Sequence, residues 1–334
     1  MQTQISRRSF AAMALSSGAM LAVGVRPLRP HRLSDGFEWI ELVSGQAWVS
    51  GNSSTGGNVL VIASKGEALI VDAKFAGISA LLRAEAEERA GAKITTLINT
   101  HHHADHTGGN VAFTADARVV AHAAAALRVW RQKDNYLKQL TDGASDMARL
   151  ARGDVPRDVE ARWQAVQARA KDDAAGAFMP TQTFDRYPAT IRVGSLRVDI
   201  YHFGPGHTDN DVVVHLPDLN LLHAGDLHFN GLHPFFDPTG GVSASGWVRS
   251  VRQVRELCDA KTRVVAGHGP LSDRDGLGRQ MDYLERLIES VALAVREGRT
   301  KDETARMQWP FMEGLGFEQI RPRAIEAVYD ELTR

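Results

Sequence analysis

The chain has 334 residues, a formal net charge of -1 at pH 7 and 43% hydrophobic residues. These values are those of a globular protein with a large core, and they exclude a chain that is disordered throughout. The 39 basic residues balance 40 acidic ones without a long basic run, which argues against a nucleic-acid partner because such binding needs clustered cations. The single cysteine, Cys258, excludes an intrachain disulfide and a multi-thiolate metal cluster. Any metal must therefore be held by histidine and carboxylate side chains.

The first 30 residues have the features of an export signal and connector. Ser6-Arg7-Arg8-Ser9-Phe10 precedes an uncharged, mostly small and apolar run over 11–25, and this pattern resembles a twin-arginine signal. The run is shorter than the roughly 20 apolar residues that a spanning helix needs. We therefore expect a periplasmic or exported protein that is moved by the twin-arginine machinery and has no stable membrane span. An ordinary N-terminal helix and retention as an uncleaved anchor are the alternatives.

Short strands and turns alternate in the next part of the chain. The strands expected there are, in order, 37–42, 46–50, 59–63, 68–71, 94–98 and 119–121. A helical pattern covers 78–90, and the segment 52–57, rich in Ser and Gly, is expected as a flap over a site or as an ordinary turn. The apolar strand over 94–98 ends in a loop crowded with histidine.

The second half repeats the order of strands before helices. A stretch over about 123–175 has helical periodicity and predicts a helical insertion. Strands are then expected over 190–193, 196–202, 212–215, 221–223 and 262–265. Helices are expected over 245–259 and from about 275 to 334. Two such halves predict two sheets packed face to face with helices outside, an α/β (α+β) fold in one domain over 35–334.

The strongest chemical signal is the segment Thr100-His101-His102-His103-Ala104-Asp105-His106. Alternation lets His101 and His103 point to one side of this loop, while Asp105 and His106 reach another. One loop can thereby supply two metal ions, since zinc binds imidazole nitrogen and carboxylate oxygen and a catalytic site keeps one position for water. His102 alternates with these candidates and is expected to face away in a structural role.

Further ligand candidates follow later apolar strands, each beside glycine. They are His207 in Gly206-His207-Thr208, Asp226 in Gly225-Asp226 and His268 in Gly267-His268-Gly269. Glycine permits the tight turns that bring backbone close to a site. Three more histidines are expected to hydrogen-bond the Asp226 loop and not a metal: His223, His228 and His233.

In this order the motifs resemble those of the metallo-β-lactamase superfamily, over about 37–272, with Asp72 in Leu69-Ile70-Val71-Asp72 as the first of them. The resemblance implies a four-layer αββα sandwich with a binuclear metal site. One ion would be bound by His101, His103 and His207. The other would be bound by Asp105, His106 and His268, with Asp226 bridging both. Asp72 would orient a ligand imidazole or support the loop. Zinc is the expected metal, and iron and manganese are alternatives because sites of this kind accept them.

Two divalent cations lower the pKa of a shared water, so that a bridging hydroxide exists near neutral pH and hydrolysis is the expected reaction. We expect cleavage of an acyl bond in a small molecule, a thioester or lactone-like ester, with Asp105 as a catalytic proton acceptor. Hydrolysis of β-lactam amides is the alternative, although Phe229 stands where many lactamases have a lysine that binds the substrate carboxylate. An iron-dependent persulfide dioxygenase is a further alternative. Substrate-binding residues are not predicted.

Overall fold

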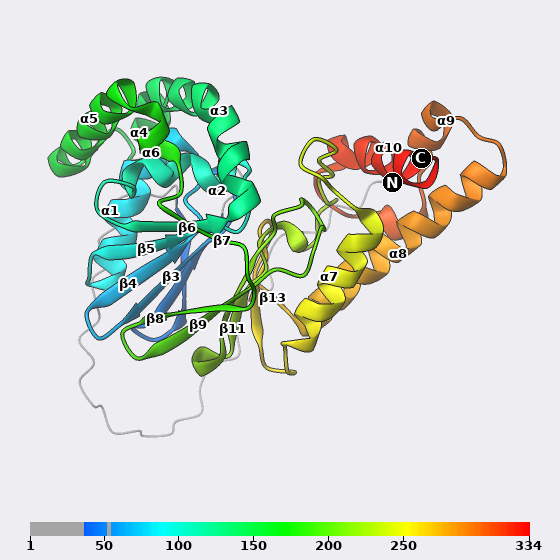
Figure 1. Ribbon diagram of the computed structural model, residues 1–334, viewed down its shortest axis with the longest axis horizontal. Helices are drawn as coiled ribbons and strands as arrows, with labels where there is room; N and C mark the ends of the chain where they lie inside the picture. The colour runs from blue at the N-terminus through cyan, green and yellow to red at the C-terminus, as the bar shows by residue number, and fades with distance from the viewer. Residues whose placement is uncertain (1–36, 52–54) are drawn as a thin grey trace, which may run out of the picture. The chain divides into compact units, whose positions relative to one another are not determined.

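The structure is a computed structural model that describes residues 37–51 and 55–334, all within one compact unit. The predicted twin-arginine segment and residues 52–54 of the predicted flap lie outside the described residues. Two sheets are present, with the strand orders β1-β2-β3-β4-β5-β6-β7 and β13-β12-β11-β10-β9-β8 (Figure 1). Among the described residues, no helix has the length and apolar character needed to cross a membrane.

The first sheet begins with antiparallel neighbours and continues from β4 onward with parallel ones. Its strands are β1 (Trp39–Val43), β2 (Ala47–Ser50), β3 (Val59–Ser64), β4 (Glu67–Val71), β5 (Ile94–Ile98), β6 (Arg118–His122) and β7 (Gln182–Phe184). The first six were predicted to within two residues at each end. The prediction missed β7, which has three residues and no apolar alternation to mark it.

The second sheet is antiparallel except where β11 pairs with β12. Its strands are β8 (Ala189–Val193), β9 (Leu196–Tyr201), β10 (Val213–Leu216), β11 (Leu221–His223), β12 (Arg263–Val265) and β13 (Ser272–Asp273). Only the two-residue β13 was not predicted, because a strand this short has no recognisable period.

Helices lie outside both sheets. Those on the first sheet are α1 (Ser79–Ala90), α3 (Ala123–Asp142), α4 (Ala144–Leu150), α5 (Arg157–Asp172) and α6 (Ala174–Phe178). On the side of the second sheet are α7 (Ala244–Glu256) and α8 (Arg274–Arg296), with α10 (Arg321–Leu332) packed on α8 and α9 (Lys301–Ala305) packed on α10. Figure 1 shows the two groups of helices on opposite outer faces. The stretch predicted as a helical insertion contains α3 to α6.

Strand β3 shows why the sheets need this layering. Its residues alternate between two cores: Val59 and Val61 pack toward the outer helices, whereas Leu60 and Ile62 pack against the second sheet. A strand buried on both faces reads as a continuous apolar run, as 59–63 does. Across the interface, Ile200 of β9 belongs to the same core as Leu60. The predicted αββα sandwich is confirmed.

The predicted chemical residues all follow the carboxyl ends of strands. Asp72 follows β4 and the histidine loop follows β5, two parallel neighbours in the first sheet. In the second sheet Asp226 follows β11 and His268 follows the parallel β12, while His207 follows β9. The carboxyl ends of codirectional strands share one edge of a sheet, and the two sheets bring these edges together.

Candidate metal centre

The histidine loop is held by the short helix α2 (Ala104–Thr107), which begins directly after His103. The N–H groups of His106 and Thr107 both donate to the carbonyl of His103, each over 3.0 Å. The Thr107 hydroxyl donates to the same carbonyl over 2.9 Å and lies 2.8 Å from the hydroxyl of Tyr136 on α3. The turn after β5 is therefore closed locally and supported from the outer helices.

Three imidazoles converge in a first cluster. Nδ1 of His103 lies 3.0 Å from Nε2 of His101 and 3.0 Å from Nε2 of His207. Oδ2 of Asp226 lies 3.7 Å from Nε2 of His101 and 3.4 Å from Nε2 of His207. These four atoms can reach one ion.

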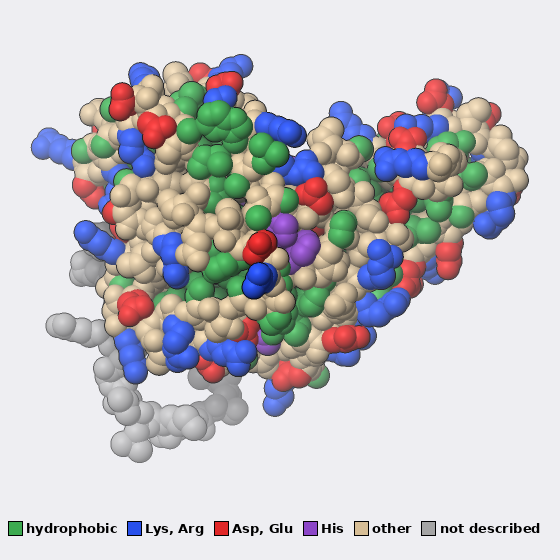
Figure 2. All heavy atoms as spheres, in the orientation of Figure 1, with side chains coloured by type: hydrophobic (Ala, Val, Ile, Leu, Met, Phe, Trp, Pro, Cys, Tyr) green, Lys and Arg blue, Asp and Glu red, His purple; other side chains and the backbone are tan. Residues whose placement is uncertain are grey.

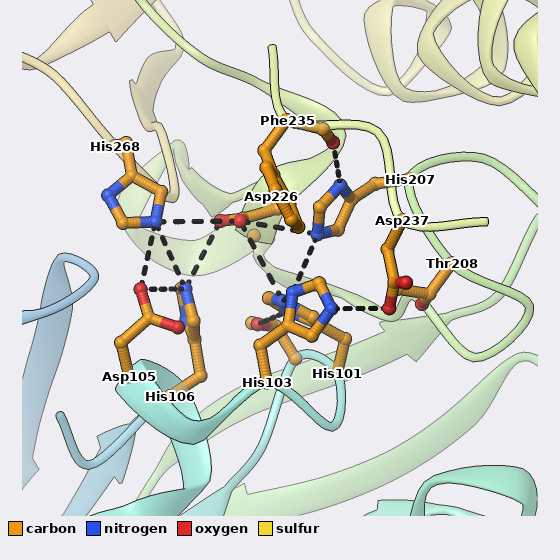
Figure 3. Close-up of polar contacts among 12 residues, drawn as sticks. His101, His103, Asp105, His106, His207, Thr208, Asp226, Phe235, Asp237 and His268 are labelled. Carbon is orange, nitrogen blue, oxygen red and sulfur yellow. Dashed lines mark hydrogen bonds and ion pairs between the residues drawn. The ribbon is translucent and has the colours of Figure 1, made fainter. Parts of the chain in front are cut away.

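A second cluster lies beside the first (Figure 3). Nε2 of His268 lies 3.4 Å from Nε2 of His106 and 3.2 Å from Oδ2 of Asp105. Asp226 contacts this cluster as well, with Oδ1 at 3.2 Å from Nε2 of His106 and Oδ2 at 3.5 Å from Nε2 of His268. The structure thus brings the seven predicted ligands together, with Asp226 between the two sets.

Three of the imidazoles have an acceptor at the nitrogen that points away from the clusters. Nδ1 of His106 lies 2.7 Å from Oδ2 of Asp72, and Nε2 of His103 lies 2.9 Å from Oδ2 of Asp237. Nδ1 of His207 lies 2.7 Å from the carbonyl oxygen of Phe235. Such acceptors hold the proton on the outer nitrogen and leave the inner nitrogen with a lone pair, as a metal ligand requires.

The charges and unpaired atoms of the centre fit cations. Burial lowers the pKa of His207 to about 3, so this imidazole is neutral. Burial alone would also lower the pKa of His268, but Asp226 and Asp105 raise it to about 9. Oδ1 of Asp226 is buried and accepts no well-directed hydrogen bond among the described residues, although Nε2 of His106 lies 3.2 Å away. The second cluster therefore requires positive charge, which protons or a metal ion can supply.

Two glycines leave the space that the ligands occupy. A Cβ on Gly57 would lie 2.2 Å from Cε1 of His106, and a Cβ on Gly267 would lie 1.9 Å from Oδ1 of Asp226. Both contacts are far inside van der Waals distance. Any larger residue at either position would displace a candidate ligand.

Several residues around the clusters were not predicted from the sequence. Asp237 lies in no recognisable motif, and neither does Lys74, whose fully buried Nζ donates to the carbonyl of Gly57 over 2.8 Å. Burial lowers the pKa of Lys74 to about 7 in spite of Asp105 and Asp72. The sequence does not show that Lys74 is buried near acidic residues. This is evident only from the fold, which places residues 55–58 beside Asp105.

The other histidines near the clusters form hydrogen bonds with groups outside the two ligand sets. His102 is buried, and its Nδ1 lies 3.0 Å from Nδ2 of Asn210, a contact that agrees with the structural role expected for it. His223 accepts from the N–H of Gly225, so its prediction as a support of the Asp226 loop agrees with the structure. The predictions for the side chains of His228 and His233 were wrong. Nε2 of His228 lies 2.8 Å from the hydroxyl of Ser272 in β13, and Nδ1 of His233 lies 2.8 Å from the hydroxyl of Tyr283 on α8, so neither ring hydrogen-bonds the Asp226 loop. Neither belongs to the two clusters.

A cavity of about 430 Å³ opens over both clusters. His103, Asp105, Asp226 and His268 form its floor. Its walls are Ala104, Gln132, Phe229, Phe235, Phe317, Gln319 and Ile320. Figure 2 shows histidine side chains at the surface of this face, with both apolar and charged side chains around them. A small molecule can reach the clusters through this cavity, whose size is typical of ligand sites.

Comparisons with known proteins agree with this geometry. A family model described as the metallo-beta-lactamase superfamily matches residues 54–268. The chain is 22% identical over 247 residues to a metallo-beta-lactamase type 2 from Bacillus cereus, covering 74% of this chain and 79% of that protein. It is 26% identical over 247 residues to the acyl-coenzyme A thioesterase MBLAC2 from Homo sapiens, covering 71% of this chain and 79% of that protein.

Solved structures show the same fold. A metallo-beta-lactamase from Pontibacter korlensis superposes with a TM-score of 0.54 at 19% identity, covering 75% of this chain and 99% of that one. The structure of TMB-1 superposes with a TM-score of 0.54 at 19% identity, and the match covers 75% of this chain and 98% of the TMB-1 chain. At this identity the likeness concerns the fold alone.

Proposed function

We propose that this chain, which belongs to the metallo-beta-lactamase superfamily, binds two divalent cations and cleaves an acyl ester or thioester. Its membership of that superfamily and its His/Asp clusters support the assignment as a metal-dependent hydrolase. The observation that carries the proposal is the position of Asp226. Its two carboxylate oxygens contact imidazoles of both clusters at 3.2 to 3.7 Å. Zinc is the proposed metal, with iron or manganese as alternatives.

We assign three ligands to each ion. His101, His103 and His207 would hold one, while Asp105, His106 and His268 would hold the other. Asp226 would bridge the pair. Two such cations supply a hydroxide near neutral pH and polarise an acyl carbonyl. The chain itself contributes the imidazoles, those of His103, His106 and His207 with an acceptor at the outer nitrogen, and a cavity that seats the acyl group over the clusters.

Asp105 would act as a proton acceptor as well as a ligand. Its carboxylate borders the cavity, and one oxygen lies 3.2 Å from Nε2 of His268. Asp105→Asn tests the double role. We expect a near-normal metal content and a loss of kcat of about 100-fold or more, the usual contribution of a positioned proton acceptor. Loss of one metal ion would instead make Asp105 a ligand only.

The test of the proposal combines elemental analysis with assays on a thioester, a lactone and a chromogenic cephalosporin. About two zinc ions per chain with turnover of a thioester or lactone would support the proposal. Preferred turnover of the cephalosporin would favour the second candidate, a β-lactamase, which the similarity to such enzymes supports. About one iron with oxygen consumed on a persulfide and no hydrolysis would overturn both.

The same proposal includes export to the periplasm by the twin-arginine machinery and a small-molecule substrate in place of nucleic acid. It rests on Arg7 and Arg8 and on the balanced charge of the chain. Cell fractionation tests the export. The wild-type protein should be found in the periplasm, and the double variant Arg7→Lys, Arg8→Lys should remain in the cytoplasm. Equal export of both would contradict it.

A further inference from the structure

The cavity over the clusters has aromatic and uncharged walls, and we propose that it selects substrates with a neutral, apolar acyl group, with Phe317 as a residue that sets this preference. The inference deepens the proposed function and rests on it. It concerns the part of the substrate remote from the reacting carbonyl, where the cations would not reach.

Aromatic rings line the cavity on several sides. The Phe235 ring lies 5.8 Å from that of His103, and the Phe229 ring stacks at 5.2 Å on that of His268. The centroids of the Phe317 and His268 rings lie 6.0 Å apart in an edge-to-face arrangement. An acyl chain that reaches the clusters must therefore pass among rings, and burial of its methylene groups against them is favourable.

Positive charge is missing from these walls. Within the described residues, no lysine or arginine lines the cavity, and its polar wall groups are the amides of Gln132 and Gln319. Arg128, one turn before Gln132 on α3, is held by Asp209 and by the carbonyl of Thr239. A carboxylate or phosphate in the walls would lose its hydration without gaining a cation, which costs free energy. The walls thus disfavour acyl groups with a distal negative charge.

Phe317 adopts an unfavourable backbone conformation. Its φ of 63° lies in the left-handed region, which a bulky aromatic residue rarely adopts. The preceding Gly316 is fixed by two backbone bonds: its N–H donates to the carbonyl of Gly231 over 3.0 Å, and its carbonyl accepts from His233 over 2.9 Å. Neighbouring hydrogen bonds hold Phe317 in this strained backbone conformation, and its ring lines the cavity. Strain that is maintained at a site in this way indicates a function for the ring.

The segment that carries Phe317 lies beyond residue 268, where the match to the superfamily ends. The clusters and part of the wall, including Gln132, Phe229 and Phe235, come from the matched part of the chain, whereas Phe317, Gln319 and Ile320 come from outside it. The part of the wall that carries Phe317 is therefore separate in the chain from the candidate ligands. We expect changes in the wall to alter selectivity without altering metal content.

The experiment compares two thioesters of N-acetylcysteamine, hexanoyl and adipoyl, which differ only by a terminal carboxylate. For the metal-loaded wild-type protein, kcat/KM should be at least about 10-fold higher for the hexanoyl substrate. Phe317→Ala should lower kcat/KM for the hexanoyl thioester by about 10-fold, mainly through KM, and leave the adipoyl value nearly unchanged. Calorimetry with the corresponding amides, under conditions in which an assay detects no amide cleavage, should give the same order of affinities.

Phe311→Ala is the matched control, because Phe311 belongs to the same C-terminal segment but lines a different cavity. It should leave the hexanoyl preference intact. Gln319→Arg supplies the missing cation and should raise kcat/KM for the adipoyl thioester, which tests the inference even if Phe317→Ala does not fold. Equal or better use of the adipoyl substrate by the wild type would overturn the inference and leave the hydrolase proposal standing. No turnover of either thioester, nor of a lactone, with two zinc ions bound would overturn both.

Discussion

Oδ2 of Asp72 lies 2.7 Å from Nδ1 of His106, and both side chains are fully buried. The same carboxylate accepts from the N–H and the hydroxyl of Thr100, each over 2.8 Å. One side chain at the end of β4 therefore fixes both the start of the histidine loop and a candidate ligand within it. Asp72 itself has a φ of 64°, a conformation that aspartate tolerates better than most residues.

Asp72→Ala should weaken metal binding because it frees the His106 ring and removes the acceptor that fixes its tautomer. Loss of such an outer partner lowers metal affinity by about 10- to 100-fold. Competition with a chromogenic chelator measures the affinity. Asp134→Ala, at a side chain 82% exposed on α3, is the control and should leave affinity unchanged. Wild-type affinity in Asp72→Ala would show that packing alone orients His106.

Asp237→Ala should affect the first cluster and spare the second. Asp237 contacts the outer nitrogen of His103 at 2.9 Å, and no contact joins it to Asp105, His106 or His268 among the interactions of the described residues. We expect about 10-fold weaker binding of one ion, so that titration with zinc resolves two unequal steps. Two equally weakened steps would contradict the assignment of His103 to a separate ion.

Gly57→Ala should displace His106, because the added Cβ would lie 2.2 Å from its ring. The expected result is loss of about one metal ion per chain with the fold retained, measured by elemental analysis and circular dichroism. Gly278→Ala on α8 is the matched control, since its Cβ would meet only Arg255 at an ordinary 3.5 Å. In a helix interior that change should stabilise the protein by about 0.5–1 kcal/mol. A normal metal content in Gly57→Ala would mean that the loop over 55–58 can move away.

The parts of this molecule that carry a period or a motif could be predicted from the sequence. Strand β3 is an apolar run, and the histidine loop directly follows another. Asp237 and Phe317 could not be predicted. Each lies in a loop whose sequence has no hydrophobic periodicity, and each contacts the clusters only because of the path that its loop takes. Asp237 reaches His103 from a position 134 residues away in the chain. Contacts at such separation depend on loop paths that local propensity does not encode.

Removing the metal should make stability depend on pH on the alkaline side. In the metal-free protein Asp226 and Asp105 raise the pKa of His268 to about 9 against the opposing effect of burial, and the pKa of His106 is raised as well. A raised pKa means that the folded state holds the proton more tightly than the unfolded state does. The resulting stabilisation is complete below the ordinary histidine pKa of 6.5 and is lost as the pH rises toward 9.

Urea unfolding at pH 6.5 and at pH 9 measures this dependence. The free energy of unfolding of the metal-free protein should fall by a few kcal/mol, because each tenfold difference in proton affinity between the folded and unfolded states contributes about 1.4 kcal/mol. His268→Gln should reduce the fall without abolishing it, because His106 still titrates. The metal-loaded protein should show a smaller fall, since cations in place of these protons keep the carboxylates neutralised at high pH. An equal fall with and without metal would show that the two histidines are not the ones that the ions displace.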